Sequence, residues 1–259
     1  MTSRADTVGA LRGALISFGD TARGLTAEQW AAPSLCPEWT VRDVVVHVAT
    51  IESAMVGWHP GDDGLFESMP AIARELHGVD DAALLARYDA VVAERSVELA
   101  ELSDEEFERA SITPVGPGTY GRFLQIRVFD VWVHERDVRV ALGLAGDDGG
   151  PVAALALDEV RSSLGYIMGK KVGLPDGAGI VVDLTGPVAT RMCVAVDGRA
   201  RVVEQLESPA VTLTTDSLTF MLLACGRIDP EEPIADGRIR WTGDGTLGER
   251  AARNLAFTM

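Results

Sequence analysis

The sequence has few cysteines and no long apolar segment. Its three cysteines, Cys36, Cys193 and Cys225, are widely separated among 259 residues and do not indicate a disulfide framework. No hydrophobic run approaches the roughly 20 residues of a membrane-spanning helix. The first residues, Met-Thr-Ser-Arg-Ala-Asp, lack the apolar stretch of a signal peptide. We therefore expect a cytoplasmic protein that spans no membrane and keeps its cysteines reduced.

Positive charge is also scarce. Lysine and arginine number 23 against 39 aspartates and glutamates, which gives a formal net charge of −16. Lysine is nearly absent, Lys170 and Lys171 form its only pair, and no basic cluster occurs. Such a chain would repel a phosphate backbone, so nucleic acid is excluded as a partner. Hydrophobic residues make up 47% of the chain, and its length fits two modest domains.

Motifs of two common enzyme classes are missing as well. The glycines of segments 116–118 and 149–150 lack the spacing and the strand-to-helix context of a phosphate loop. No Gly-x-Ser-x-Gly elbow marks a nucleophilic serine. Cys36 precedes a predicted helix, whose dipole can lower the pKa of a thiol, but a small packed residue before a turn explains Cys36-Pro37 equally well. These motifs therefore do not locate a catalytic site in this chain.

The segment from residue 130 to 137 places ionisable side chains on an apolar helix face. At about 100° per residue, Asp130, His134 and Asp137 share a sector with apolar neighbours, namely Phe123, Ile126, Val133 and Ala141. Burying such groups is costly unless they are paired or bind a metal. A metal site, a buried hydrogen-bonded dyad and ordinary helix-surface pairing with Arg127 and Arg136 all stay open.

A metal site would need a further ligand from elsewhere, because a catalytic zinc takes about three protein ligands. Only four histidines occur, and His47 is the best placed. It lies on a predicted helix that starts at Thr40, with Asp43 completing a capping-box-like pair. His47 flanks the apolar stripe of that helix and is in line with Ile51. By itself, it could equally be a hydrogen-bonded helix histidine.

The periodicity predicts a helical first domain. Four helices are expected, at residues 5–23, 40–58, 80–101 and 119–142, and they favour an up-down four-helix bundle. A loop rich in glycine, proline and aspartate, from His59 to about Met69, is expected to form part of an active-site rim.

A turn-rich segment, residues 146–151, separates the bundle from a mixed region. Beyond it we expect an α+β domain with helices and short strands, at residues 151–168, 179–184, 189–196, 200–204, 211–214, 216–225, 239–242 and 245–256. The fold class is therefore α+β with two domains, residues 1–148 and 149–259.

Two stretches of the chain resemble a known family. The segment Trp30–His47, and the pattern Asp130-x-x-x-His134-x-x-Asp137 continuing to Gly143, are similar to the mycothiol-dependent maleylpyruvate isomerase family. The tail also resembles this family, in segments 211–220, 226–227 and 243–257. The resemblance covers nearly the whole chain. It implies a DinB-like metal-binding four-helix bundle followed by a small sterol-carrier-protein-like α/β domain.

The resemblance also implies the site. His47, Asp130 and His134 correspond to the metal ligands of the family, and Asp130 replaces the glutamate of its better-known members. Asp137 corresponds to an aspartate that orients the second histidine. The implied cofactors are a divalent metal, most simply Zn²⁺, and mycothiol as thiol cosubstrate.

The implied activity is that of an isomerase or thiol transferase, which acts on a small electrophile as a monomer or homodimer. Arg238 and Arg240, near predicted strand ends, are catalytic candidates because an anionic thiol or carboxylate substrate needs a cationic partner. Two alternatives stay open. One is a non-catalytic ligand-binding protein with a structural metal, and the other is an Fe²⁺ enzyme with the same ligands.

Overall fold

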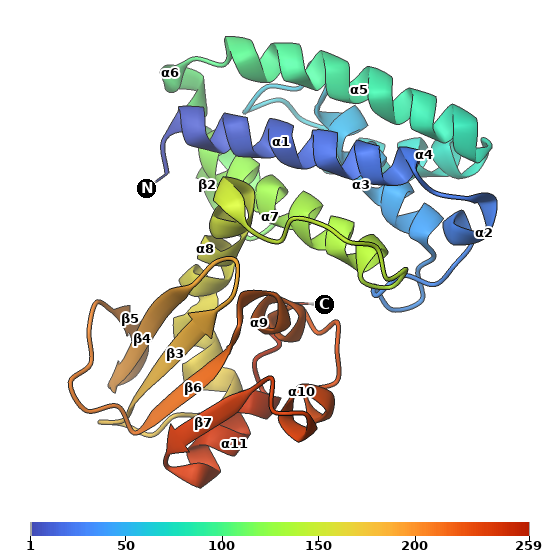
Figure 1. The fold of residues 1–259 in the computed structure, drawn as a ribbon. Coiled ribbons are helices and arrows are strands. Elements are labelled where there is room, and N and C mark those ends of the chain that lie inside the picture. Colours follow the sequence, from blue (N-terminus) through green and yellow to red (C-terminus); the bar gives the residue numbers. More distant parts are fainter. Residues whose placement is uncertain (1, 259) are drawn as a thin grey trace. The chain divides into compact units, whose positions relative to one another are not determined.

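The structure is a computed structural model that describes residues 2–258. It divides into two compact units, one ending at Gly146 and the other beginning at Asp147 (Figure 1). The first is predominantly helical, and the second combines helices with a five-stranded sheet. The expected α+β class with two domains is confirmed. The division falls at the start of the turn-rich segment 146–151.

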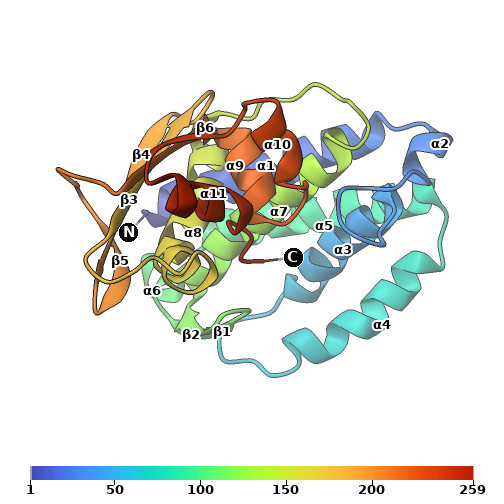
Figure 2. The ribbon, with the colours of Figure 1, turned by 90° about the horizontal axis from the view of Figure 1, so that it is seen from below.

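The N-terminal unit is a bundle of four long helices. Each packs against two others, because α1 and α3 both contact α5 and α7 (Figure 2). The helices are α1 (Arg4–Arg23), α3 (Val41–Met55), α5 (Asp81–Glu101) and α7 (Tyr120–Arg139). Their apolar stripes form the core, where Leu11, Val45, Leu84 and Phe123 are almost completely buried.

The start of α3 is fixed by the expected capping box. The Thr40 hydroxyl accepts the backbone N–H of Asp43, and the Asp43 carboxylate accepts the backbone N–H of Thr40. The helix ends at Met55, before the expected end at residue 58. Gly57 follows in a left-handed conformation with a φ of 67°, and its N–H donates to the Glu98 side chain at 2.7 Å. This turn ends the helix.

The connections contain elements that the sequence patterns did not predict. Helix α4 (Leu65–His77) begins within the expected loop and packs along α3. Pro70 lies inside α4, and proline there removes a hydrogen-bond donor, so packing on α3 outweighs local preference. The other additions are the hairpin β1 (Ala110–Thr113) and β2 (Gly116–Thr119) and the short helix α6 (Asp104–Phe107), while the short helix α2 (Ala27–Trp30) precedes α3.

The C-terminal unit is built on a mixed sheet of order β5-β4-β3-β6-β7, in which only the β3–β6 pair is parallel. The strands are β3 (Gly179–Thr185), β4 (Thr190–Asp197), β5 (Arg199–Val203), β6 (Val211–Asp216) and β7 (Arg240–Gly243). Its helical segments are α8 (Gly150–Tyr166), η1 (Ile167–Lys171), α9 (Ser217–Ala224), α10 (Glu231–Ala235) and α11 (Gly245–Arg253). Of these, α10 was not predicted.

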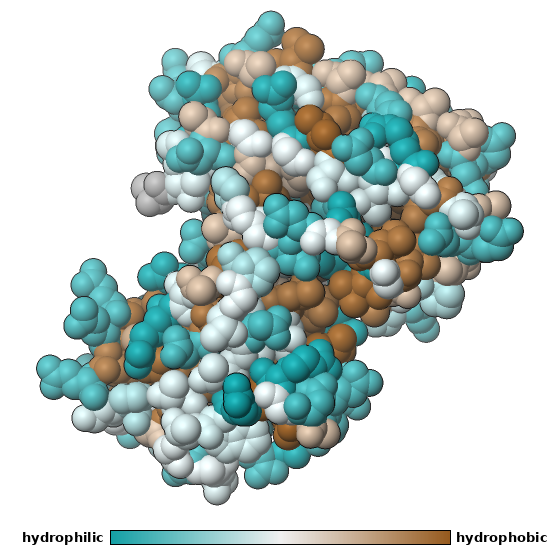
Figure 3. Space-filling view, in the orientation of Figure 1, coloured by the Kyte–Doolittle hydropathy of each residue, from teal (hydrophilic) through white to brown (hydrophobic). Residues whose placement is uncertain are grey.

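The surface carries the polar residues that the composition requires. On the face in Figure 3, hydrophilic side chains are spread over both units. Among the described residues, no helix combines the length and the apolar character needed to cross a membrane.

Candidate metal centre

Helices α3 and α7 bring His47, Asp130 and His134 together. The Nε2 atom of His47 lies 3.5 Å from Oδ2 of Asp130, and Nε2 of His134 lies 3.5 Å from Oδ1 of the same carboxylate. One ligand atom from each of the three residues falls within 4.8 Å of the other two. The three residues that the resemblance implied as ligands therefore form one cluster.

The spacing of this cluster fits a shared cation better than direct hydrogen bonds. Distances of 3.5 Å exceed the 2.7–3.2 Å typical of N–H···O bonds. Two ligand atoms bound at about 2.1 Å to one tetrahedral zinc would lie roughly 3.4 Å apart. The buried Nε2 atom of His47 also makes no hydrogen bond. Two imidazoles and a carboxylate at this spacing suit a divalent metal ion.

Asp137 sets the orientation of the His134 ring. Its fully buried carboxylate lies 2.9 Å from Nδ1 of His134. A proton on Nδ1 leaves Nε2 facing Asp130, which is the arrangement found for metal-bound histidines. Burial alone would lower the pKa of His134, but the carboxylates of Asp130 and Asp137 raise it to about 9. Without an ion, the imidazole therefore holds two protons, and a metal would replace the one on Nε2.

The loop before α3 covers the two histidines. The Trp39 ring centroid lies 5.1 Å from that of His47 and 5.9 Å from that of His134, and Trp39 stacks on the latter. The Leu35 N–H donates to the Asp137 carbonyl at 3.0 Å, so the loop is attached to α7. Cys36 has its sulfur within 4.8 Å of ligand atoms of His134 and Asp137. In the sequence, the feature that could have predicted this cover is Trp39, which directly precedes the N-cap residue Thr40.

A chain of buried charges supports Asp130 from behind. Glu52, on α3, has no exposed surface and accepts from Arg95 Nε at 3.3 Å and from Arg127 Nε at 3.0 Å. Arg127 in turn donates to Asp130. Burial would raise the pKa of Asp130, but Arg127 and then His134 hold it well below its usual value. The carboxylate is thus ionised and ready to bind a cation.

These supporting residues correct the surface-pairing interpretation. Arg127 does pair with Asp130, but it is only 2% exposed and belongs to the bundle interior. Arg136 stays apart from the cluster, because it pairs with Glu135 at 2.9 Å and stacks on Trp132. Glu52 and Arg95 were not predicted from the sequence. A glutamate on the valine-rich helix α3 was the signal that could have revealed Glu52.

Comparisons with known proteins identify the family. Residues 11–139 match the family model described as "Mycothiol maleylpyruvate isomerase N-terminal domain", and residues 154–250 match the one described as "MDMPI C-terminal domain". The chain belongs to this family. Its two domain models together account for most of the sequence, and the family is one of enzymes.

Solved structures of similar fold agree with this assignment. A crystal structure of the mycothiol-dependent maleylpyruvate isomerase matches with a TM-score of 0.60, and that of a histidine-to-alanine mutant with 0.63. Each match has 16% identity and covers 88% of this chain and 90% of the other. At 16% identity, the structural similarity establishes the fold but not the activity. No curated protein was found to match the sequence.

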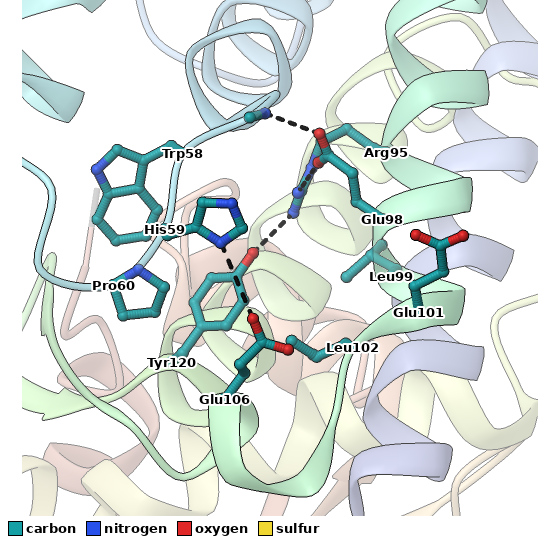
Figure 4. A pocket seen from close by; sticks show the side chains of 11 residues that line it. Trp58, His59, Pro60, Arg95, Glu98, Leu99, Glu101, Leu102, Glu106 and Tyr120 are labelled. Atoms are coloured by element: carbon teal, nitrogen blue, oxygen red, sulfur yellow. Dashed lines mark hydrogen bonds and ion pairs between the residues drawn. The ribbon is translucent and has the colours of Figure 1, made fainter.

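Two cavities open into the bundle of this family member. One, of about 520 Å³, is lined by His47 and lies between α3 and α4. The other, of about 370 Å³, surrounds Arg95, which donates to Glu98 at 2.6 Å and to the Tyr120 hydroxyl at 3.2 Å (Figure 4). His59 also lines the second cavity, so this histidine is separate from the metal cluster. Only the first cavity reaches a candidate ligand.

The catalytic arginine candidates lie at the surface of the C-terminal unit. Arg238 is half-exposed and its Nε donates to Asp236 at 2.7 Å. Arg240 begins β7 and is exposed. Both belong to the C-terminal unit, whereas all three candidate ligands belong to the N-terminal unit.

Proposed function

We propose that this protein is a metal-dependent enzyme that activates a low-molecular-weight thiol, mycothiol, for reaction with a small electrophile. The observation that carries the proposal is the cluster of His47, Asp130 and His134, whose donor atoms have the spacing expected around one divalent ion. Family membership supports mycothiol as the thiol and an isomerase as the reaction type. Zn²⁺ is the metal that this donor set suits best.

Residues around such an ion would have separate roles in orienting its ligands, excluding water and binding the thiol or substrate. When bound, a divalent cation stabilises a thiolate far more than a thiol and so supplies a nucleophile at neutral pH. Asp137 holds the His134 ring, and Arg127 holds the Asp130 carboxylate. Trp39 shields one side of both histidines from water. Arg238 and Arg240 are proposed to contact anionic groups of the thiol or the substrate.

Two reaction types follow from a thiolate at this position. Addition to an activated double bond, followed by rotation and elimination, gives cis–trans isomerisation. Displacement of a leaving group gives a thioether. Both use the same nucleophile, so one site can support either reaction.

The decisive experiment combines metal analysis with a thiol assay. Protein purified without oxygen should contain about one divalent ion per chain, and the identity of the ion separates zinc from iron. His134→Ala should lose most of this metal, whereas the matched control His59→Ala should retain it, because His59 lies at the other cavity. Full occupancy in His134→Ala would refute the ligand assignment.

Mycothiol-dependent conversion of a panel of electrophiles is then measured, both as loss of the thiol and as cis–trans isomerisation, because isomerisation regenerates the thiol. Metal-loaded wild-type protein should accelerate it, and His134→Ala should not. An intact metal site without any thiol turnover would instead support a ligand-binding protein with a structural metal.

A further inference from the structure

The cavity beside His47 has mostly apolar walls. It lies between α3 and α4, encloses about 520 Å³, and is within the size range of small-molecule sites. Its apolar lining residues come from both helices and are Val46, Ile51, Met69, Pro70 and Ala73. Because His47 also lines it, a molecule in this cavity would lie directly beside the metal cluster. This is where an electrophile would meet an activated thiol.

The charged groups of this cavity have one sign. Its acidic lining residues are Glu38 and Asp43, and among the described lining residues none is a lysine or an arginine. His77, the other histidine on the wall, faces Asp43, with its Nδ1 3.8 Å from that carboxylate. Glu38 has a φ of 65°, a conformation that costs free energy for a residue with a side chain. Such strained residues concentrate at functional sites.

Arginines adjoin this cavity without lining it. Arg74 is exposed on α4, directly after the lining residue Ala73. Arg42, next to Asp43 in the sequence, pairs with Asp81 at 2.9 Å and donates to the carbonyl of Leu76 at 3.2 Å, in the last turn of α4. Arg127 is buried between Glu52 and Asp130. Neither lines the cavity. Away from the metal cluster at His47, a substrate carboxylate would therefore meet two like charges and no arginine on these walls.

We propose that the electrophile of this enzyme is a small, largely apolar molecule without negative charge, such as an uncharged unsaturated ester or ketone. This inference rests on the proposed function. It separates this chain from the solved relatives, which are named for maleylpyruvate, a dicarboxylate. In the reaction, the thiol sulfur bonds to the β-carbon of the double bond and the thiol proton ends on the α-carbon. No oxidant or reductant is needed.

The first test compares dimethyl maleate with maleate, which share a carbon skeleton and differ in charge. Thiol-dependent loss of the cis alkene, which follows both adduct formation and isomerisation, is measured with metal-loaded protein, and each kcat/KM is divided by the rate constant of the uncatalysed reaction. This correction is needed because the ester is intrinsically more reactive. We expect a preference of at least about tenfold for the ester, the ratio that corresponds to 1.4 kcal/mol. An equal or greater enhancement for maleate would overturn the proposal.

Charge reversal on the cavity wall provides a matched pair of variants. Glu38→Lys should shift the corrected preference toward maleate by about tenfold. Glu67→Lys makes the same change of net charge on α4 but outside the lining, and it should leave the preference unaltered. If both variants shift it equally, the cavity is not the electrophile site.

Binding to metal-free protein tests the cavity without any turnover. Dimethyl succinate and succinate are unreactive toward thiols, and their dissociation constants can be compared by protein NMR. Tighter binding of the diester, lost in Ala73→Lys, supports the proposal, whereas tighter binding of succinate overturns it. Absence of thiol-dependent conversion of either maleate compound would count against the proposed function alone. A wild-type preference for maleate that disappears in an Arg238→Gln/Arg240→Gln variant would assign substrate carboxylates to the C-terminal unit and overturn the inference.

Discussion

Replacement of Glu52 by glutamine should strongly destabilise the N-terminal unit. The substitution keeps the shape of the side chain and creates no cavity, but it removes the negative charge that Arg95 and Arg127 share. The amide carbonyl can accept from one arginine, while the amide NH₂ group faces the other. Both arginines are at most 2% exposed, so water cannot replace the lost carboxylate.

The magnitude follows from the remaining partners. Removing one member of a buried ion pair costs about 3–5 kcal/mol. The lower end applies here, because Arg95 keeps Glu98 and Tyr120, and Arg127 keeps Asp130. In a domain of about 150 residues, a loss of about 3 kcal/mol lowers Tm by roughly 6–12 °C.

The matched control is Glu98→Gln, which removes a carboxylate from the same Arg95. Glu98 is 34% exposed, so its ion pair is partly screened and the change should cost about 1 kcal/mol or less. Both variants are compared with the wild type by urea denaturation of metal-free protein, followed by circular dichroism. Equal stability of Glu52→Gln and wild type, or a larger loss in Glu98→Gln, would refute the reasoning about buried charge.

Three further outcomes test the metal site. Asp137→Asn should weaken metal binding by about 10–100-fold without abolishing it, as measured by competition with a chelator; unchanged affinity would mean that Asp137 does not orient His134. Asp130→Glu should keep the metal, because it offers the same oxygen donor from one carbon further out, and complete loss in metal analysis would argue against ligation by Asp130. Residues 1–148 alone should fold and bind metal, because they contain all proposed ligands, but should turn over thiol poorly; equal rates at equal metal occupancy would remove the C-terminal unit from the mechanism.

Much of the architecture follows from local signals in the sequence. The capping box at Thr40 and the long apolar periods predicted the four bundle helices, and the alternating short segments predicted the strands of the sheet. The convergence of His47 with Asp130 could be expected only through the family resemblance. Periodicity identifies the buried face of a helix, but it does not identify the helix that lies opposite.

The helix, the hairpin and the buried charges that were not predicted all depend on tertiary structure. Helix α4 contains Pro70 and is preceded by Gly64, two residues that normally indicate a turn, yet its apolar face is stabilised by α3. The glycine- and proline-rich segment before α7 forms a hairpin, in which Gly116 adopts a φ of 111°. Glu52 and its arginines come from three different helices. Their pairing depends on packing that no single segment encodes.

The sharing of one carboxylate by two arginines also constrains how this sequence can vary. Loss of Glu52 alone removes the carboxylate that links the two buried arginines, and loss of either arginine leaves that carboxylate half-compensated. Replacing such a buried group of charges together by apolar side chains is often neutral or stabilising. The effects of substitutions at residues 52, 95 and 127 should therefore be strongly non-additive. In the divergence of related chains, these positions are expected to change as a set or to remain fixed together, so covariation at them would record the buried charges of the bundle interior that also hold Asp130.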